Sequence, residues 1–355
     1  MVTATASQQT TFDAMTQFLG VMMDPFINGR GDGVTAGTIA TPFAEEIDAA
    51  NAYAAKDPAR SKSERDAYAA IYRKAPPISG PFTPSWSVWA AGYGGSQTTD
   101  GNATFGSNSA TSRIAGTAVG ADYRFSPFTL AGFAPAGGGT NFSVANGGTG
   151  RSDLFQAGAF VRHTVGAAYV TRALAYGWQD ITTDRSVTIA GVDVLRAEFN
   201  ANAWSGRVEG GYRFITLWMG GVGITPYAAG QFTTFDLPAY AEQVLSGAST
   251  FALAYASNSE TDTRSELGLR TDKSFAMHAW AHDFNPDRNI AATFQTLPSA
   301  SFVVNGAAQA SDSALTTASA EIKWLNGWSA AATFEGEFSE VTRSYAGKGV
   351  VRYNW

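Results

Sequence analysis

The chain ends in GKGVVRYNW, residues 347–355, and this stretch decides the fold class. Counted back from Trp355, every second residue is aromatic, apolar or glycine, while the residues between them include Asn354 and Arg352. Alternation with a period of two is typical of a β-strand with two different faces. Chain ends are usually frayed, so a strand that ends in tryptophan needs a partner on each side. A closed barrel supplies both partners, because it has no free edge.

Segments of strand length follow one another from residue 86 onward, and several alternate as clearly as the last one. In one of them Trp204 and Val208 share a face, while Arg207 and Glu209 share the other. We therefore predict twelve strands, centred on residues 86–95, 113–125, 128–139, 154–165, 167–178, 202–214, 223–235, 263–272, 275–284, 316–325, 328–338 and 344–355.

Charged residues on these segments lie opposite the apolar face, and aromatic residues gather at strand ends, as in the YRF triplets at 123–125 and 212–214. A soluble sandwich also has one polar face, but it does not explain aromatic residues concentrated at strand ends. A transmembrane barrel does, because it has aromatic girdles at both interfaces and a polar lumen. We predict an all-β, twelve-stranded antiparallel transmembrane β-barrel with a pore lined by Asp122, Arg124, Arg207, Glu209, Arg213, Arg264, Glu266, Arg270, Glu321, Lys323, Glu335 and Glu337.

The composition favours the same class. Only 15% of the 355 residues are charged, against about 25% in average proteins, and no apolar run approaches the ~20 residues of a membrane helix. A net charge of −6 without a basic run argues against nucleic acid as a partner. Cysteine is absent, which suits a chain that crosses an oxidising compartment unfolded, although chance also explains it. The start, MVTATASQQ, lacks the features of a signal peptide, so an envelope protein with this sequence would be a fragment.

Connections between the predicted strands alternate between long and short. Short turns at one end are typical of the periplasmic side of outer-membrane barrels, and longer loops are typical of the outer side. An even number of strands then places residue 80 and Trp355 at the periplasmic end. The long connections are expected at 98–111, 141–152, 181–198, 237–260 and 285–313, and the last connection, 340–343, is brief.

Residues 86–355 resemble the C-terminal translocator domain of monomeric autotransporters, the type V secretion proteins. The resemblance is carried by WSVWAAGYGG, GTAVGADYRFSP, RVEGGYRF, RSELGLRTDKSFAM and the terminal RSYAGKGVVRYNW, in this order. SFAMHAWAHDF departs from the family because it is shorter than the usual eighth turn and ninth strand, which leaves these strand boundaries open.

This resemblance implies a barrel in the outer membrane of a Gram-negative bacterium, which anchors a passenger and exports it to the cell surface. It implies outer-membrane lipid, the β-barrel assembly machinery, periplasmic chaperones and the chain's own passenger as partners, with a monomeric barrel and no cofactor. The last strand resembles the signal that the assembly machinery reads, with Val351, Tyr353 and Trp355 as its residues.

Residues 1–80 carry helix signals instead of strand signals. A first apolar helical face includes Phe12 and Met15 and ends at Asp24-Pro25, while Ser61 and Glu64 form a capping box. We predict that residues 1–40 are the end of a passenger or an extracellular linker with a short helix, 41–80 a helical linker, and 81–355 the barrel. With both barrel ends periplasmic and the passenger outside, the chain must pass through the lumen. The expected pore helix is about 61–74, with Lys62, Glu64, Arg65, Asp66, Arg73 and Lys74 facing the charged lumen.

Three further patterns have plainer explanations than a site. The Arg-Gly-Asp triplet in GRGDG, residues 29–33, is explained by a turn-rich loop, and His278 and His282 would lie ~13 Å apart on a strand, too far for one metal. Glu335 and Glu337 are better structural partners for lumen arginines than a catalytic pair. No GxSxG, P-loop or zinc spacing occurs, so we predict no enzyme activity. There are two alternatives. The chain could be a general outer-membrane porin, or its loops or N-terminal residues could carry an adhesin or enzyme activity.

Overall fold

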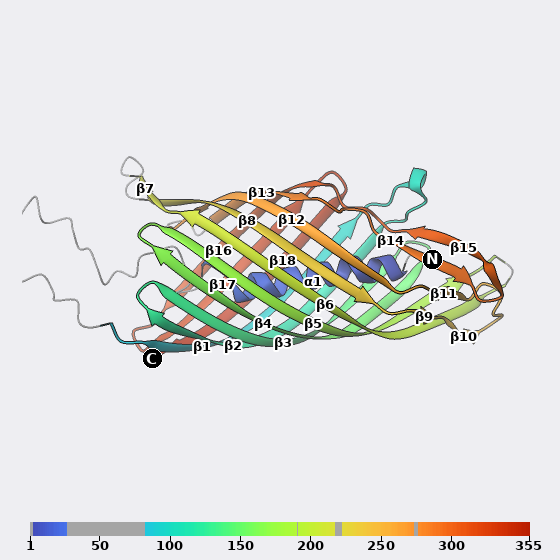
Figure 1. Ribbon diagram of the computed structural model, residues 1–355, viewed down its shortest axis with the longest axis horizontal. Helices are drawn as coiled ribbons and strands as arrows, with labels where there is room; N and C mark the ends of the chain where they lie inside the picture. Colours follow the sequence, from blue (N-terminus) through green and yellow to red (C-terminus); the bar gives the residue numbers. More distant parts are fainter. Residues whose placement is uncertain (1–2, 27–81, 190, 217–221, 273–275) are drawn as a thin grey trace, which may run out of the picture. The chain divides into compact units, whose positions relative to one another are not determined.

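The computed structural model describes residues 3–26 and 82–355, except residues 190, 217–221 and 273–275. Its main element is a closed antiparallel barrel of twelve strands, and Figure 1 shows a helix inside it. The fold class predicted from the sequence is therefore confirmed. The barrel strands are β1 (Ser85–Thr99), β2 (Ala110–Ser126), β3 (Thr129–Val144), β4 (Gly148–Val165), β5 (Ala168–Val187), β6 (Asp193–Tyr212), β8 (Val222–Leu237), β12 (Asn258–Thr271), β13 (Ala276–Asp283), β16 (Asp312–Lys323), β17 (Trp328–Phe338) and β18 (Thr342–Asn354).

The last strand closes the ring. β18 pairs along its length with β1 on one side and with β17 on the other. The backbone N–H of Trp355 donates to the carbonyl of Trp86 at 3.1 Å, so the ladder reaches the last residue of the chain. On the outward face the ring of Tyr353 stacks on Trp355 and also contacts Trp328. Backbone pairing and aromatic contacts together hold this terminus.

Two of the five connections expected to be long are tight hairpins. β3 and β4 are joined by residues 145–147, and β5 and β6 by residues 188–192. Asn146 adopts a positive φ of 56° in the first of these turns, which asparagine tolerates better than most residues. Most of the polar residues that we predicted to form these loops belong to strands. They do so because β3 to β6 continue to pair with one another beyond the apolar part of the barrel.

The connections 238–257 and 284–311 form a small sheet of their own. It contains β9 (Tyr240–Ala241), β11 (Leu253–Tyr255), β14 (Asn289–Phe294) and β15 (Leu297–Asn305), in the order β15-β14-β11-β9. β10 (Gln243–Ser246) instead pairs with the outer part of β6. We call this small sheet the cap. The connection after β1 carries a short 3-10 helix, η1 (Ala103–Phe105), and β7 (Phe214–Thr216) pairs with β8 at the opposite end of the barrel.

The helix inside the ring is α1 (Thr3–Met22), and almost all of its side chains are buried. Its contacts are mainly with β2, β3, β4 and β5. No helix among the described residues is long and apolar enough to cross a membrane. The outward face of the strands carries exposed large apolar residues such as Val208, Leu174 and Phe133, as expected for a wall that faces lipid.

Candidate functional site

The lumen and the helix within it form the candidate site. α1 begins at the long-loop end, where the Gln8 side chain donates to the Asn289 carbonyl of β14 at 3.3 Å. It runs toward the short-turn end, where β1 starts, as Figure 1 shows. The helix ends at Met22, just before Asp24-Pro25, and the Asp24 carboxylate accepts from the Phe26 N–H at 2.9 Å.

The helix carries many small polar residues in its first half, and their hydroxyls are satisfied locally. Ser7, Thr10 and Thr11 donate to carbonyls three or four residues earlier, at 2.7–2.8 Å. A buried hydroxyl without a partner is costly, so this back-bonding lets a polar helix fill a confined lumen.

One side of α1 packs closely against the barrel wall. Gly177 and Gly158 lie where a Cβ atom would come within 2.8 Å and 3.0 Å of Met15 and Met22. The absence of side chains at these two glycines lets the helix approach the wall. Gln156 of β4 also donates to the Ala14 carbonyl at 3.1 Å. This side of the helix therefore fits one particular wall.

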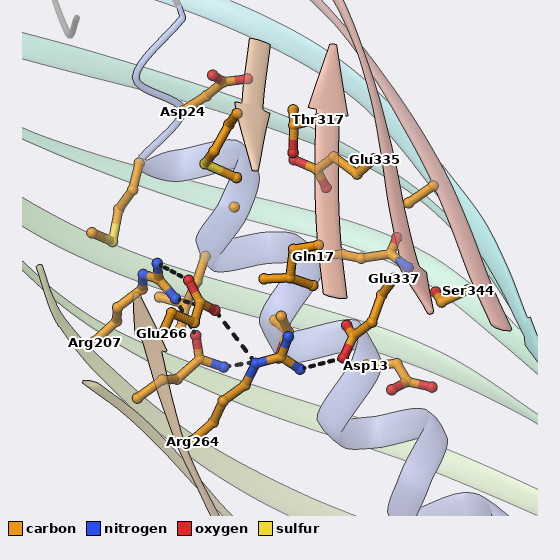
Figure 2. Close-up of a pocket in the computed structure, with 18 of the residues that line it drawn as sticks. Asp13, Gln17, Asp24, Arg207, Arg264, Glu266, Thr317, Glu335, Glu337 and Ser344 are labelled. Carbon is orange, nitrogen blue, oxygen red and sulfur yellow. Dashed lines mark hydrogen bonds and ion pairs between the residues drawn. The ribbon is translucent and has the colours of Figure 1, made fainter. Parts of the chain in front are cut away.

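The other side of α1 faces a charged cavity of about 170 Å³. Figure 2 shows Arg207, Glu266, Arg264 and Glu337 facing one another beside the helix. Arg207 contacts Glu266 at 2.7 Å, and Arg264 contacts Glu337 at 2.9 Å. Glu209 extends this series of ion pairs, because it binds Arg207 at 3.0 Å and a further arginine, Arg270, at 2.8 Å. Alternating charges thus neutralise one another across β6, β12 and β17.

Two basic residues, one on a barrel strand and one in the connection that forms the cap, hold the helix directly. Lys348 of β18 lies at the helix C-terminus, where its ammonium group contacts the Gly20 carbonyl at 3.1 Å and Asp24 at 3.2 Å, as well as Glu335 at 2.6 Å. A cation at this end also interacts favourably with the helix dipole.

Arg288, in the connection that forms the cap, holds the first half of the helix. It is almost fully buried, donates to Gln9 at 2.9 Å, pairs with Asp262 at 2.9 Å, and lies 4.6 Å from the Phe12 ring centre. Together, Arg288 and Lys348 grip α1 at two places.

A further buried ion pair fixes the cap to the barrel wall. Arg185 of β5 donates to Glu242, and the hydroxyl of Tyr255 donates to the same carboxylate at 3.2 Å. The rings of Phe199, Tyr240 and Tyr255 stack in sequence, with centroid distances of 3.9 and 4.6 Å. Burial, followed by the nearby Glu242 carboxylate, raises the pKa of Tyr255 above its usual range.

The sequence-predicted pore residues are distributed unequally. Arg207, Glu209, Arg264, Glu266, Arg270, Glu335 and Glu337 line the cavity beside α1. The others lie elsewhere on the inward face or near the short turns: Asp122 is buried against Arg352 at 3.1 Å, Arg124 lies by Pro127, Arg213 pairs with Asp272, and Glu321 contacts Lys323 at 3.1 Å.

The remaining predicted residues fall into three cases. The expected pore helix at 61–74 lies outside the described residues. Val351, Tyr353 and Trp355 lie on the outward face of the last strand or directly after it. Glu335 and Glu337 bind different cations, Lys348 and Arg264. Among the residues that the structure describes, no three acidic, histidine or cysteine side chains are grouped as metal ligands.

Sequence reasoning missed several buried charged residues of the lumen and the cap. Lys348 and Arg352 alternate inward on the terminal strand, so the period that identified the strand could also have identified them. Arg288 and Glu242 lie in connections without alternation, and nothing in the sequence indicates that they are buried.

Comparisons with known proteins agree with this architecture. A family model described as the autotransporter beta-domain matches residues 88–335. The translocator domain of the autotransporter NalP from Neisseria meningitidis is similar, with a TM-score of 0.62 at 17% identity, over 76% of this chain and 88% of that one. The beta domain of the Bordetella autotransporter BrkA gives 0.53 at 15% identity, over 76% and 99%. No curated protein sequence matches the chain.

Proposed function

Because the chain belongs to the autotransporter beta-domain family, we propose that α1 is the segment that joins the passenger to the barrel through the pore. The chain is the outer-membrane translocator of an autotransporter in a Gram-negative bacterium. The observation that carries the proposal is the path of α1, which begins at the long-loop end and runs inside the ring toward the short-turn end. A passenger ahead of Thr3 would then lie outside the cell.

In this proposal the lumen holds the linker after transport. Contacts to one wall, together with Lys348 and Arg288, fix the helix. The ion-paired side chains of β6, β12 and β17 beside it keep the rest of the pore hydrated. None of these groups needs to make or break a bond, so the role is passage and anchoring. We also propose that the barrel acts as a monomer, since its ring has no free edge that needs a second copy.

The partners outside the chain are part of the same proposal. The outward apolar wall would contact outer-membrane lipid, and the β-barrel assembly machinery would read the terminal strand while periplasmic chaperones keep the chain unfolded.

Residues 61–74 remain our prediction for a helix in the linker. Deletion separates the two candidates for the plug, the helix that fills the pore. If α1 is the plug, removing residues 3–22 raises planar-bilayer conductance clearly, and removing 61–74 leaves it low. The opposite result would assign the plug to 61–74.

The absence of cysteine allows a direct test of orientation. Ala145→Cys lies in the tight turn between β3 and β4, and Asn326→Cys lies in the turn between β16 and β17 at the other end. A membrane-impermeant maleimide applied to intact cells should label Ala145→Cys, and should label Asn326→Cys only after the outer membrane is permeabilised. An epitope inserted before Thr3 should bind antibody on intact cells.

These controls separate two kinds of failure. If Asn326→Cys is labelled on intact cells and Ala145→Cys is not, the barrel has the opposite orientation. If both cysteines behave as expected but the epitope is reached only after permeabilisation, then the orientation holds and the proposed path of the passenger is wrong.

A further inference from the structure

The outer face of the barrel has a basic groove near the long-loop end. It has a volume of about 440 Å³ and crosses β2, β3, β4, β5 and β6. The strand register aligns its residues in a row: Arg113 lies opposite Asn141, and Asn141 opposite Arg151. Strands lie about 4.8 Å apart, so the two arginines stand about 10 Å from each other with an amide between them.

The two arginines in this row are available to a ligand. Both are exposed, because the alternation turns them away from the lumen. Within the described part of the chain, neither takes part in an ion pair, whereas the third arginine of the groove, Arg196, is held by Asp184 at 2.7 Å. The groove therefore presents two free guanidinium groups, which suit phosphate oxygens because each can donate two parallel hydrogen bonds.

The height of the groove limits what can reach it. Phe155 and Trp178 lie opposite each other on the same outer face, both substantially exposed, as in the aromatic girdle at a membrane interface. Arg151 lies four residues before Phe155 on β4, nearer the long-loop end. At 3.3 Å per residue and a strand tilt near 40°, it stands about 10 Å beyond the girdle, on the head-group side of the membrane interface.

We propose that this groove binds the phosphorylated sugar head group of an outer-leaflet glycolipid. The outer leaflet of this membrane is rich in phosphorylated glycolipids, and such a head group approaches the wall from the side, along the face on which Arg113 and Arg151 stand. A free anion could bind the same groups, but only a lipid would be held at this height by its acyl chains on the apolar wall below.

Two acidic residues beneath the groove provide a control, because their removal should change binding in the direction opposite to removal of the arginines. Asp153 and Asp180 lie directly opposite each other between the arginine row and the aromatic pair. Two carboxylates at this position repel a phosphate, so D153N/D180N should strengthen binding where R113Q/R151Q weakens it. If a metal ion instead bridged the carboxylates and the phosphate, D153N/D180N would weaken binding.

The test uses the full chain folded in detergent and titrated with bisphosphorylated lipid A, with bound lipid measured by native mass spectrometry. R113Q/R151Q should weaken binding roughly tenfold or more, since each basic residue near a phosphate-rich surface contributes modestly and the two act together. R113K/R151K should keep part of the binding. R343Q is the matched control, because Arg343 is an exposed arginine on the outward face of β18 near the same end but outside the groove. Heat-modifiable gel mobility checks that every variant is folded.

The outcomes divide cleanly. Loss in R113Q/R151Q but not in R343Q, with weak binding of dephosphorylated lipid A and little competition by inorganic phosphate, supports the glycolipid site. Equal loss in R343Q, or equal binding of dephosphorylated lipid A, would show general adsorption and overturn it. Strong competition by inorganic phosphate would show a site for the free anion and would overturn the proposal. Weaker binding in D153N/D180N would show that a metal ion joins the carboxylates to the lipid phosphate, which would overturn recognition of the head group by the two arginines.

Discussion

Replacing Lys348 by methionine removes the cation at the C-terminal end of α1 while keeping a side chain of similar length. The ammonium group is buried and contacts the Gly20 carbonyl, Asp24 and Glu335. Asp24 is almost completely buried, so without Lys348 its carboxylate loses its paired charge. Breaking a buried pair in this way typically costs 3–5 kcal/mol. Asp24 keeps donors from Phe26 and Thr333, so we expect about 3 kcal/mol.

A loss of this size concerns the helix and leaves the barrel closed, since the strands are held by backbone pairs on both sides. About 3 kcal/mol corresponds to roughly a hundredfold higher population of detached α1. Hydrogen exchange of the folded protein in detergent should therefore quicken about a hundredfold for α1 amides in Lys348→Met and hardly change for β18. Planar-bilayer conductance should rise in the same variant.

Two further variants make this reasoning refutable. Lys323→Met also removes an inward lysine, but Lys323 is 55% exposed and its ion pair within the described part of the chain is with Glu321, so the expected cost is at most about 1 kcal/mol. The double variant D24N/K348M removes the stranded charge and should recover most of the protection, because asparagine can still accept from Phe26. Unchanged exchange of α1 in Lys348→Met, or an equal effect of Lys323→Met, would show that Lys348 does not anchor the helix.

Three other predictions concern the barrel wall, the last strand and the cap. Val208→Arg places a charge on the lipid-facing wall and should destabilise the barrel by ~2–4 kcal/mol without changing the charge of the lumen, whereas Arg207→Leu leaves the buried Glu209 and Glu266 without their shared cation and should change planar-bilayer conductance; a change in conductance in Val208→Arg but not in Arg207→Leu would mean that the assigned faces are exchanged. Changing Tyr353 and Trp355 together to serine should reduce outer-membrane protein in cells but allow near-normal refolding in detergent, because the backbone ladder survives; poor refolding would make these residues structural, and normal insertion in cells would exclude them as an assembly signal. The raised pKa of Tyr255 means that the folded cap excludes the phenolate, so cap stability should fall as pH rises above about 10; absorbance titration of wild type against Tyr255→Phe should show a late-titrating phenol that the variant lacks.

The sequence by itself determined the strands and their faces. A period of two is a local property of extended backbone, so the inward direction of Arg207 or Glu266 and the outward direction of Val208 can be read without knowing which strands are neighbours. The alternation also identified the last strand. The tight hairpins after β3 and β5 escaped prediction because polar strand ends outside a membrane have the same composition as loops.

The tertiary structure alone decided what fills the lumen and which charges meet. α1 fits because Gly158 and Gly177 on neighbouring strands leave room for Met22 and Met15, a match that exists only after the barrel closes. Partners such as Arg264 and Glu337 stand on strands that are not adjacent in the ring. Strand alternation gives each residue a face but no distance across the lumen. The identity of every pair therefore depends on the curvature of the closed ring and on the helix that takes up part of it.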